Sequence, residues 1–233
     1  DLVIALKELD ELFNHRGEAS SGESEVLNAI RQEIPLRLGI RFEDFLPSER
    51  RMKVSLALLK HLAAHKYPVM INTKSGLPGE EPYLSALADN AGGAAVHITL
   101  ISSDEKLTKL LEPGAPTVKQ RLAAAKALSA AGVRVVARIE PWMALINDDE
   151  ARVKEYMEAI WEAGIRYLTF DSYSYSAGSR GIGENFAAVG LDFDRMFLLS
   201  ADSQWLSSYL LGLFIQEFRN RGFRCSTFDQ GNA

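Results

Sequence analysis

The amino-acid sequence predicts an α/β fold in which parallel strands alternate with helices. Short runs rich in Val, Ile and Leu alternate with longer segments whose apolar residues recur at helical spacing. Strands joined by helical crossovers must run parallel, and near-continuous apolar runs suit strands buried on both faces. The strands are expected at 35–40, 67–74, 94–102, 133–140 and 165–171, with a sixth at 223–228.

Helices are expected between these strands. The segment 48–66 is amphipathic, and Ser48 is placed to cap it. The segment 117–132 ends at Gly132, where a left-handed C-cap costs least. The remaining helices are expected at 2–13, 81–91, 148–164 and 200–222, with a short one beginning at Ser103 and Asp104.

Two architectures fit this alternation, an open doubly wound sheet and a partial (β/α) barrel. An open sheet that binds a dinucleotide should carry a glycine-rich turn after its first strand, and the glycine cluster at 176–183 follows a late strand instead. The sequence therefore favours a partial (β/α) TIM-like barrel. The chain opens on Asp1 within a helical pattern, so we expect a single domain over 1–233 that is truncated at both ends.

Composition narrows the class of protein. The 233 residues are 47% hydrophobic and 24% charged, with a net charge of −5, which gives no global attraction to nucleic acid. No apolar run approaches the roughly 20 residues of a membrane span. Cys225 is the single cysteine, which excludes an internal disulfide and leaves too few thiolates for a zinc or iron–sulfur site. We expect a cytoplasmic protein without a membrane partner.

Polar residues gather where the predicted strands end, and in either architecture these ends form the ligand face. Lys74 could contact a carboxylate or form a Schiff base, although a lone lysine is more often a solvated strand terminus. Glu112 could be catalytic or could pair with Arg121, nine residues later, and the two roles are about equally supported. The residue types indicate a binding site but leave its chemistry open.

The histidines give weaker signals. His97 lies between apolar residues of a predicted strand, and a buried, hydrogen-bonded core role is favoured over that of a ligand. His61 and His65 are four residues apart on one helix face, which is metal-like spacing. Because no carboxylate motif accompanies them, we interpret them as surface residues and assign no metal ligand.

Three segments carry an ordered set of short motifs: "GIRFEDFLPSERR" (39–51), "INTKSGL" (71–77) and the long stretch 96–135. The stretch 96–135 contains a Leu-Glu-Pro with a nearby Ala-Pro, followed by an Arg-Leu helix. Taken together, the three segments resemble the spore photoproduct lyase family of radical SAM proteins. The positions that match the family pattern are Asp44, Phe45, Pro47, Glu49, Thr73, Lys74, Ser75, Thr99, Ser102, Leu111, Glu112, Pro113, Ala115, Pro116, Arg121 and Leu122.

The resemblance implies a radical SAM enzyme that uses S-adenosylmethionine (AdoMet) and a [4Fe–4S] cluster, with lyase or DNA-lesion repair chemistry. The family's three-cysteine loop is absent, so we expect it upstream of Asp1 and expect this segment alone to be inactive. A zwitterionic cofactor needs a cation, hydroxyls and anions. The implied cofactor-binding residues are Lys74, Ser75, Thr99, Ser102, Glu112, Arg138 and Glu140, and the catalytic residues are left unassigned.

Other functions and partners remain open. A class I aldolase-like barrel would use Lys74 as its Schiff-base lysine, and a non-catalytic small-molecule-binding barrel is a third class. A nucleic-acid substrate is implied by the resemblance, but the loops at the barrel mouth are acidic in balance. Their charged residues are Lys74, Arg138 and Arg180 against Glu43, Asp44, Glu112, Glu140 and Asp171. We therefore expect weak binding to duplex DNA.

Overall fold

The strands of the computed structural model form one parallel sheet in the order β1-β2-β3-β4-β5-β6. The structure describes residues 2–15, 25–143, 150–172, 187, 190 and 204–227. The strands are β1 (Leu36–Leu38), β2 (Val69–Thr73), β3 (Ala94–Thr99), β4 (Arg134–Trp142), β5 (Tyr167–Ser172) and β6 (Arg224–Thr227). A doubly wound sheet would reverse its strand order at a switch point. The sequential order confirms the α/β partial barrel and all six predicted strands.

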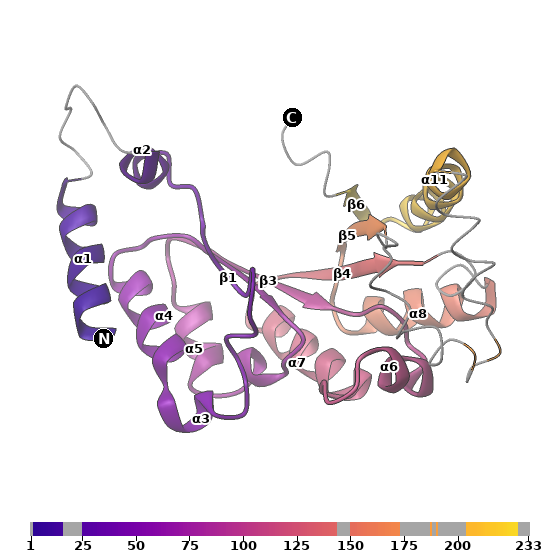
Figure 1. Ribbon diagram of the computed structural model, residues 1–233, viewed down its shortest axis with the longest axis horizontal. Helices are drawn as coiled ribbons and strands as arrows, with labels where there is room; N and C mark the ends of the chain where they lie inside the picture. Colours follow the sequence, from indigo (N-terminus) through magenta and orange to yellow (C-terminus); the bar gives the residue numbers. More distant parts are fainter. Residues whose placement is uncertain are drawn as a thin grey trace.

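Helices follow the strands and lie mainly along one side of the sheet (Figure 1). Across the described ranges they are α1 (Leu2–Asn14), α2 (Glu25–Arg31), α3 (Glu49–Met52), α4 (Val54–Ala64), the 3₁₀ turn η2 (Leu77–Gly79), α5 (Tyr83–Ala88), α6 (Glu105–Leu111), α7 (Val118–Ala130), α8 (Glu150–Glu162) and α11 (Gln204–Asn220). No helix of this set is both long and apolar enough to cross a membrane. The sequence patterns did not predict α2 or η2.

The prediction of one continuous helix over 48–66, capped by Ser48, is wrong. Lys53 has φ 54°, a left-handed conformation that separates α3 from α4. Ser48 makes no side-chain capping bond. Glu49 takes that role for α4, because its buried carboxylate accepts from the backbone N–H groups of Val54 and Leu56, both at 3.1 Å. N-cap rules look for Ser, Thr, Asp or Asn directly before a helix, so they do not detect a glutamate that caps α4 from the preceding helical turn.

One face of the sheet packs against the helices. Ile71, Val96 and Val135 are register partners on neighbouring strands and are almost fully buried. Toward β5 and β6 the same core continues into an aromatic cluster, in which Phe170 lies 5.8 Å, centroid to centroid, from Phe218 of α11. These contacts keep the strands in register and fix where their carboxyl ends lie.

The opposite face is polar, which corrects the expectation that both faces are apolar. Residues that alternate with the core positions point to this side, including Asn72 and His97, which are register partners on β2 and β3. Thr99 and Arg138 form the next partnered pair toward the strand ends. A parallel sheet can leave one face polar when that face lines the interior of an incomplete barrel. The strand faces thus contribute to the ligand side as well as the loops.

Candidate functional site

The carboxyl end of β2 is held by Glu43, which lies in the loop after β1. Its Oε1 accepts from the Thr73 hydroxyl at 2.7 Å, and its Oε2 accepts from the Lys74 backbone N–H at 2.8 Å. Thr73 Oγ1 in turn accepts from the Ser75 N–H at 2.8 Å. These bonds satisfy backbone donors where the strand ladder stops. They also set the direction in which the Lys74 side chain leaves the strand.

Arg121 of α7 holds the loop 112–117, which connects α6 to α7. Its side chain is fully buried, and its Nη1 donates to Glu112 Oε2 at 2.6 Å and to the Thr99 carbonyl at 2.9 Å. Its Nε donates to the Pro116 carbonyl at 2.9 Å. The pairing of Glu112 with Arg121 is confirmed. A single guanidinium therefore links the end of β3 to both sides of the loop.

Lys74 completes this network from β2. Its Nζ lies 2.7 Å from Glu112 Oε1, an ion-pair contact without hydrogen-bond alignment, and its side chain is 44% exposed. Glu112 thus stands between a buried and an accessible cation. If the Lys74 ammonium turned from Glu112 toward a ligand carboxylate, the buried ion pair between Arg121 and Glu112 would remain intact. This geometry makes the Lys74 ammonium available to a ligand carboxylate.

Three predicted site residues share one cavity of about 190 Å³ at the carboxyl ends of β2, β3 and β4. They are Lys74, Thr99 and Arg138. Residues 39–43, in the loop after β1, also line this cavity. Small-molecule sites usually measure about 300–1,000 Å³, so this cavity suits one end of a ligand rather than a whole cofactor.

The other predicted residues lie around this cavity rather than in it. Ser75 lines a neighbouring cavity of about 640 Å³, which Glu43 and Lys74 also border. Ser102 accepts from the Asp104 N–H at 3.0 Å, and so shapes the start of α6. Glu140 pairs with Arg138 and accepts from the Thr169 hydroxyl at 3.1 Å. The structure therefore separates three cavity residues from Ser102 and Glu140, which hold or orient their neighbours.

Asn72 is a cavity residue that sequence reasoning missed. It is 6% exposed, and its Oδ1 is buried without a hydrogen-bond partner among the described residues. A buried, unpaired amide oxygen is costly unless a ligand or water donates to it. The sequence feature that could have identified Asn72 is its polar side chain within the otherwise apolar run 67–74.

His97 is the register partner of Asn72 on the polar face. Burial, and then the nearby positive charges of Arg138 and Arg37, lower the pKa of His97 to about 4. The imidazole is therefore neutral at pH 7 and able to donate or accept a hydrogen bond. The prediction of a buried core histidine is therefore corrected: His97 is half-buried on the polar face, between Asn72 and Val136, where the charges of Arg138 and Arg37 affect its pKa.

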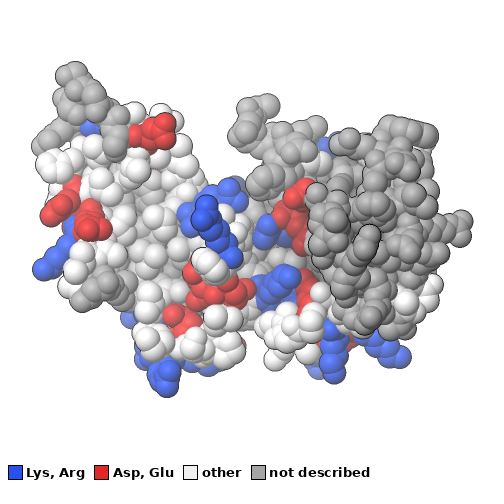
Figure 2. Space-filling view, viewed as in Figure 1, with Lys and Arg blue, Asp and Glu red and all other residues white. Residues whose placement is uncertain are grey.

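Further arginines lie along the polar sheet face. Arg134 and Arg224 place their guanidinium carbons 5.3 and 5.6 Å from the ring centroid of Tyr167, on the strand between them. Figure 2 shows basic and acidic side chains close together across the middle of this side of the molecule. Arg180, counted above among the cations of the mouth, lies outside the described residues.

Comparisons with known sequences give distant relatives. No family model matches the chain. Uncharacterized proteins of Mycobacterium bovis and Mycobacterium tuberculosis are 26% identical to it over 144 residues, which is 62% of this chain and 42% of each relative. The chain thus spans less than half the length of these curated relatives.

Comparisons with solved structures agree on the fold. A mutant spore photoproduct lyase matches with TM-score 0.58 at 17% identity, over 83% of this chain and 53% of that one. A further mutant of that enzyme, with bound AdoMet and dinucleoside spore photoproduct, matches with TM-score 0.54 at 17% identity over the same shares. Streptococcus suis SuiB bound to S-adenosylmethionine matches with TM-score 0.50 at 15% identity, over 95% and 61%. The chain has the same α/β partial-barrel fold as these proteins.

Proposed function

We propose that this chain forms the AdoMet-binding part of a radical SAM enzyme. The observation that carries the proposal is the cavity that joins Lys74, Thr99 and Arg138 at the carboxyl ends of adjacent strands. The ligands of parallel α/β folds bind at this end. Solved neighbours with the same fold hold AdoMet, which supports that ligand over an arbitrary one.

The cavity suits the amino-acid end of AdoMet. Lys74 and Arg138 provide positive charge for a carboxylate. Asn72 offers its unpaired amide oxygen to an ammonium group, and the Thr99 hydroxyl can donate or accept. The small volume matches a zwitterionic head group, so the nucleoside would extend beyond the cavity.

The chain itself does not fit a [4Fe–4S] cluster. Cys225 is its single cysteine, and burial raises the pKa of this thiol to about 11, with Arg219 opposing the change. A half-buried thiol whose pKa is raised in this way is a poor source of thiolate. The proposal therefore gives this chain the binding and orientation of AdoMet, and the thiolates for a cluster would come from residues outside it.

The aldolase alternative has less support. A Schiff-base lysine needs a desolvated pocket or a second cation to activate its amine. Lys74 is 44% exposed and pairs with a buried carboxylate. This arrangement suits electrostatic binding.

Calorimetric titration of AdoMet into the iron-free chain tests the proposal, because the affinity measured without iron reports only the contacts that AdoMet makes with this chain. Lys74→Ala should weaken binding by about 1.5–3 kcal/mol, the value of a charged hydrogen bond. That loss corresponds to about 10- to 150-fold in Kd. Lys126→Ala, an exposed lysine of α7, is the matched control. No AdoMet binding by the chain, or equal affinity of the two variants, contradicts the proposal.

Duplex DNA is expected to bind weakly. Tight duplex binding needs several Lys or Arg contacts to phosphates. On the polar sheet face Arg138 pairs with Glu140, while Arg134 and Arg224 both stack near Tyr167. A mobility-shift titration at moderate salt should show no preference for ultraviolet-treated over untreated duplex. Sub-micromolar, damage-selective binding would instead make nucleic acid the substrate.

A further inference from the structure

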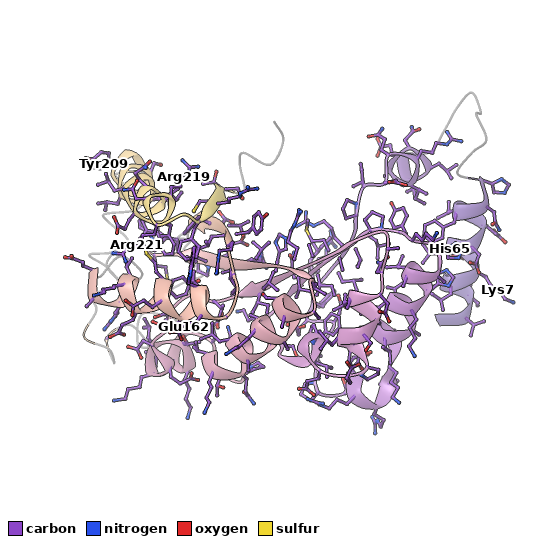
Figure 3. All side chains as sticks on the ribbon, turned by 180° about the vertical axis from the view of Figure 1, so that it is seen from behind. Lys7, His65, Glu162, Tyr209, Arg219 and Arg221 are labelled. Atoms are coloured by element: carbon purple, nitrogen blue, oxygen red, sulfur yellow. The ribbon has the colours of Figure 1, made fainter. Side chains whose placement is uncertain are left out.

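A cluster of two imidazoles and one carboxylate lies far from the AdoMet cavity, between α1 and the last turn of α4. His61 lies in α4, His65 is the residue that caps its carboxyl end, and Asp10 lies in α1. Figure 3 shows His65 beside the N-terminal helix, on which Lys7 is labelled. Because α4 ends just before β2 begins, this cluster lies at the amino end of the sheet, whereas the cavity lies at the carboxyl end.

The three side chains converge on one point. Asp10 Oδ1 lies 2.9 Å from His65 Nε2 and 3.3 Å from His61 Nε2. One ligand atom from each residue lies within 4.8 Å of the others. Bonds of 2.0–2.1 Å in a tetrahedral zinc site separate neighbouring ligand atoms by about 3.3 Å. The two separations between Asp10 and the imidazoles are close to this spacing, and the separation between the two imidazoles is no more than 4.8 Å.

His61 gives an independent indication that a ligand belongs there. Its Nε2 is buried and, within the described part of the chain, makes no hydrogen bond, despite the nearby Asp10 oxygen. Asp10 Oδ1 lies within hydrogen-bonding distance of His65 Nε2, whereas His61 Nε2 is within ion-pair distance of the same oxygen but makes no hydrogen bond to it. A cation bound by all three groups would satisfy that nitrogen.

The imidazole rings are held in place before any ion arrives. Phe13 of α1 packs against both, with ring centroids 6.2 Å from His61 and 4.7 Å from His65. The side chains of His61 and His65 are 16% and 31% exposed, so a site here remains in contact with solvent. The carboxyl end of a helix also favours positive charge. These features correct the interpretation of His61 and His65 as simple surface residues.

We propose that Asp10, His61 and His65 form a binding site for one first-row divalent cation of the zinc class, which bridges α1 and α4. Two nitrogens and one oxygen suit Zn²⁺ and its neighbours in the series. Three protein ligands leave a fourth position for water. Because the ligands come from two helices, the bound ion would fasten α1 against the barrel and stabilise the folded chain.

Zn²⁺ binding to the tag-free chain tests this site, with equilibrium dialysis for stoichiometry and Co²⁺ absorption for coordination. We expect one Zn²⁺ per chain, a rise in Tm on its addition, and a visible Co²⁺ spectrum that Zn²⁺ removes. Asp10→Asn changes a partly exposed side chain and should fold normally. It should weaken Zn²⁺ binding at least about 10-fold and remove the Tm rise, by loss of a ligand.

The other two histidines of the chain provide matched controls. His15→Gln and His97→Gln each remove one imidazole and should retain the affinity for Zn²⁺. His61→Gln with His65→Gln should abolish stoichiometric binding. The proposal is overturned if the parent chain binds no stoichiometric Zn²⁺, if Asp10→Asn binds as the parent does, or if a control variant loses the ion.

Discussion

Replacing Arg121 by alanine is expected to lower the free energy of unfolding by about 3–5 kcal/mol, the usual cost of breaking a buried ion pair. The guanidinium is fully buried and holds Glu112, the end of β3 and the Pro116 carbonyl together. Its removal leaves Glu112 in a buried position with Lys74 as its remaining charged partner in the described structure. Urea denaturation followed by circular dichroism measures the change.

Two further variants distinguish the cost of leaving a charge buried from the cost of losing side-chain packing. Lys74→Met removes the exposed partner of the same carboxylate and should cost at most about 1 kcal/mol. Combining Arg121→Met with Glu112→Gln removes both buried charges and should recover part of the loss. If Arg121→Ala destabilises no more than Lys74→Met, the network does not fix this loop as described.

The strands and most helices were predictable from local pattern. Apolar runs marked the strands, and Gly132, with φ 80°, ends α7 with the left-handed conformation that was expected after a helix. Thr117 begins the same helix with a capping box, in which its hydroxyl accepts from the Gln120 N–H at 3.2 Å. Such elements depend on neighbours only a few residues away, so a single sequence contains the information.

The site was predictable in residue type but not in arrangement. The sequence placed Lys74, Thr99 and Arg138 at strand ends, and the structure brings them into one cavity. It gave no means to separate Ser102, which shapes the start of α6, from the cavity residues. Which side chains face inward depends on strand register, and register is set by contacts between distant segments.

The cluster of Asp10, His61 and His65 shows the same limit more clearly. The spacing of His61 and His65 was visible in the sequence, but their carboxylate partner is 51 residues before the first of them. Only the packing of α1 on α4 brings Asp10 to the two rings. Helical spacing can identify ligands on one helix, whereas a ligand from a second helix requires the tertiary structure.

Acid should destabilise the chain partly through His97. Burial is the main cause that lowers the pKa of His97 to about 4, and the charges of Arg138 and Arg37 add to it. In the unfolded chain an imidazole titrates near 6.5. Between these values the unfolded state binds more protons than the folded state, so stability rises with pH across the window from about 4 to 6.5.

His97→Gln isolates this contribution. The gap between 6.5 and about 4, at about 1.4 kcal/mol for each pKa unit, corresponds to about 3 kcal/mol lost by the parent chain at the acid end of the window. The variant should lose that much less when its free energy of unfolding is measured by urea denaturation at pH 7 and pH 4. His15→Gln, at the exposed end of α1, should keep the slope of the parent. Parallel curves for the parent and His97→Gln would mean that His97 takes up its proton at the same pH in the folded and the unfolded chain, and that the polar face of the sheet tolerates its charge.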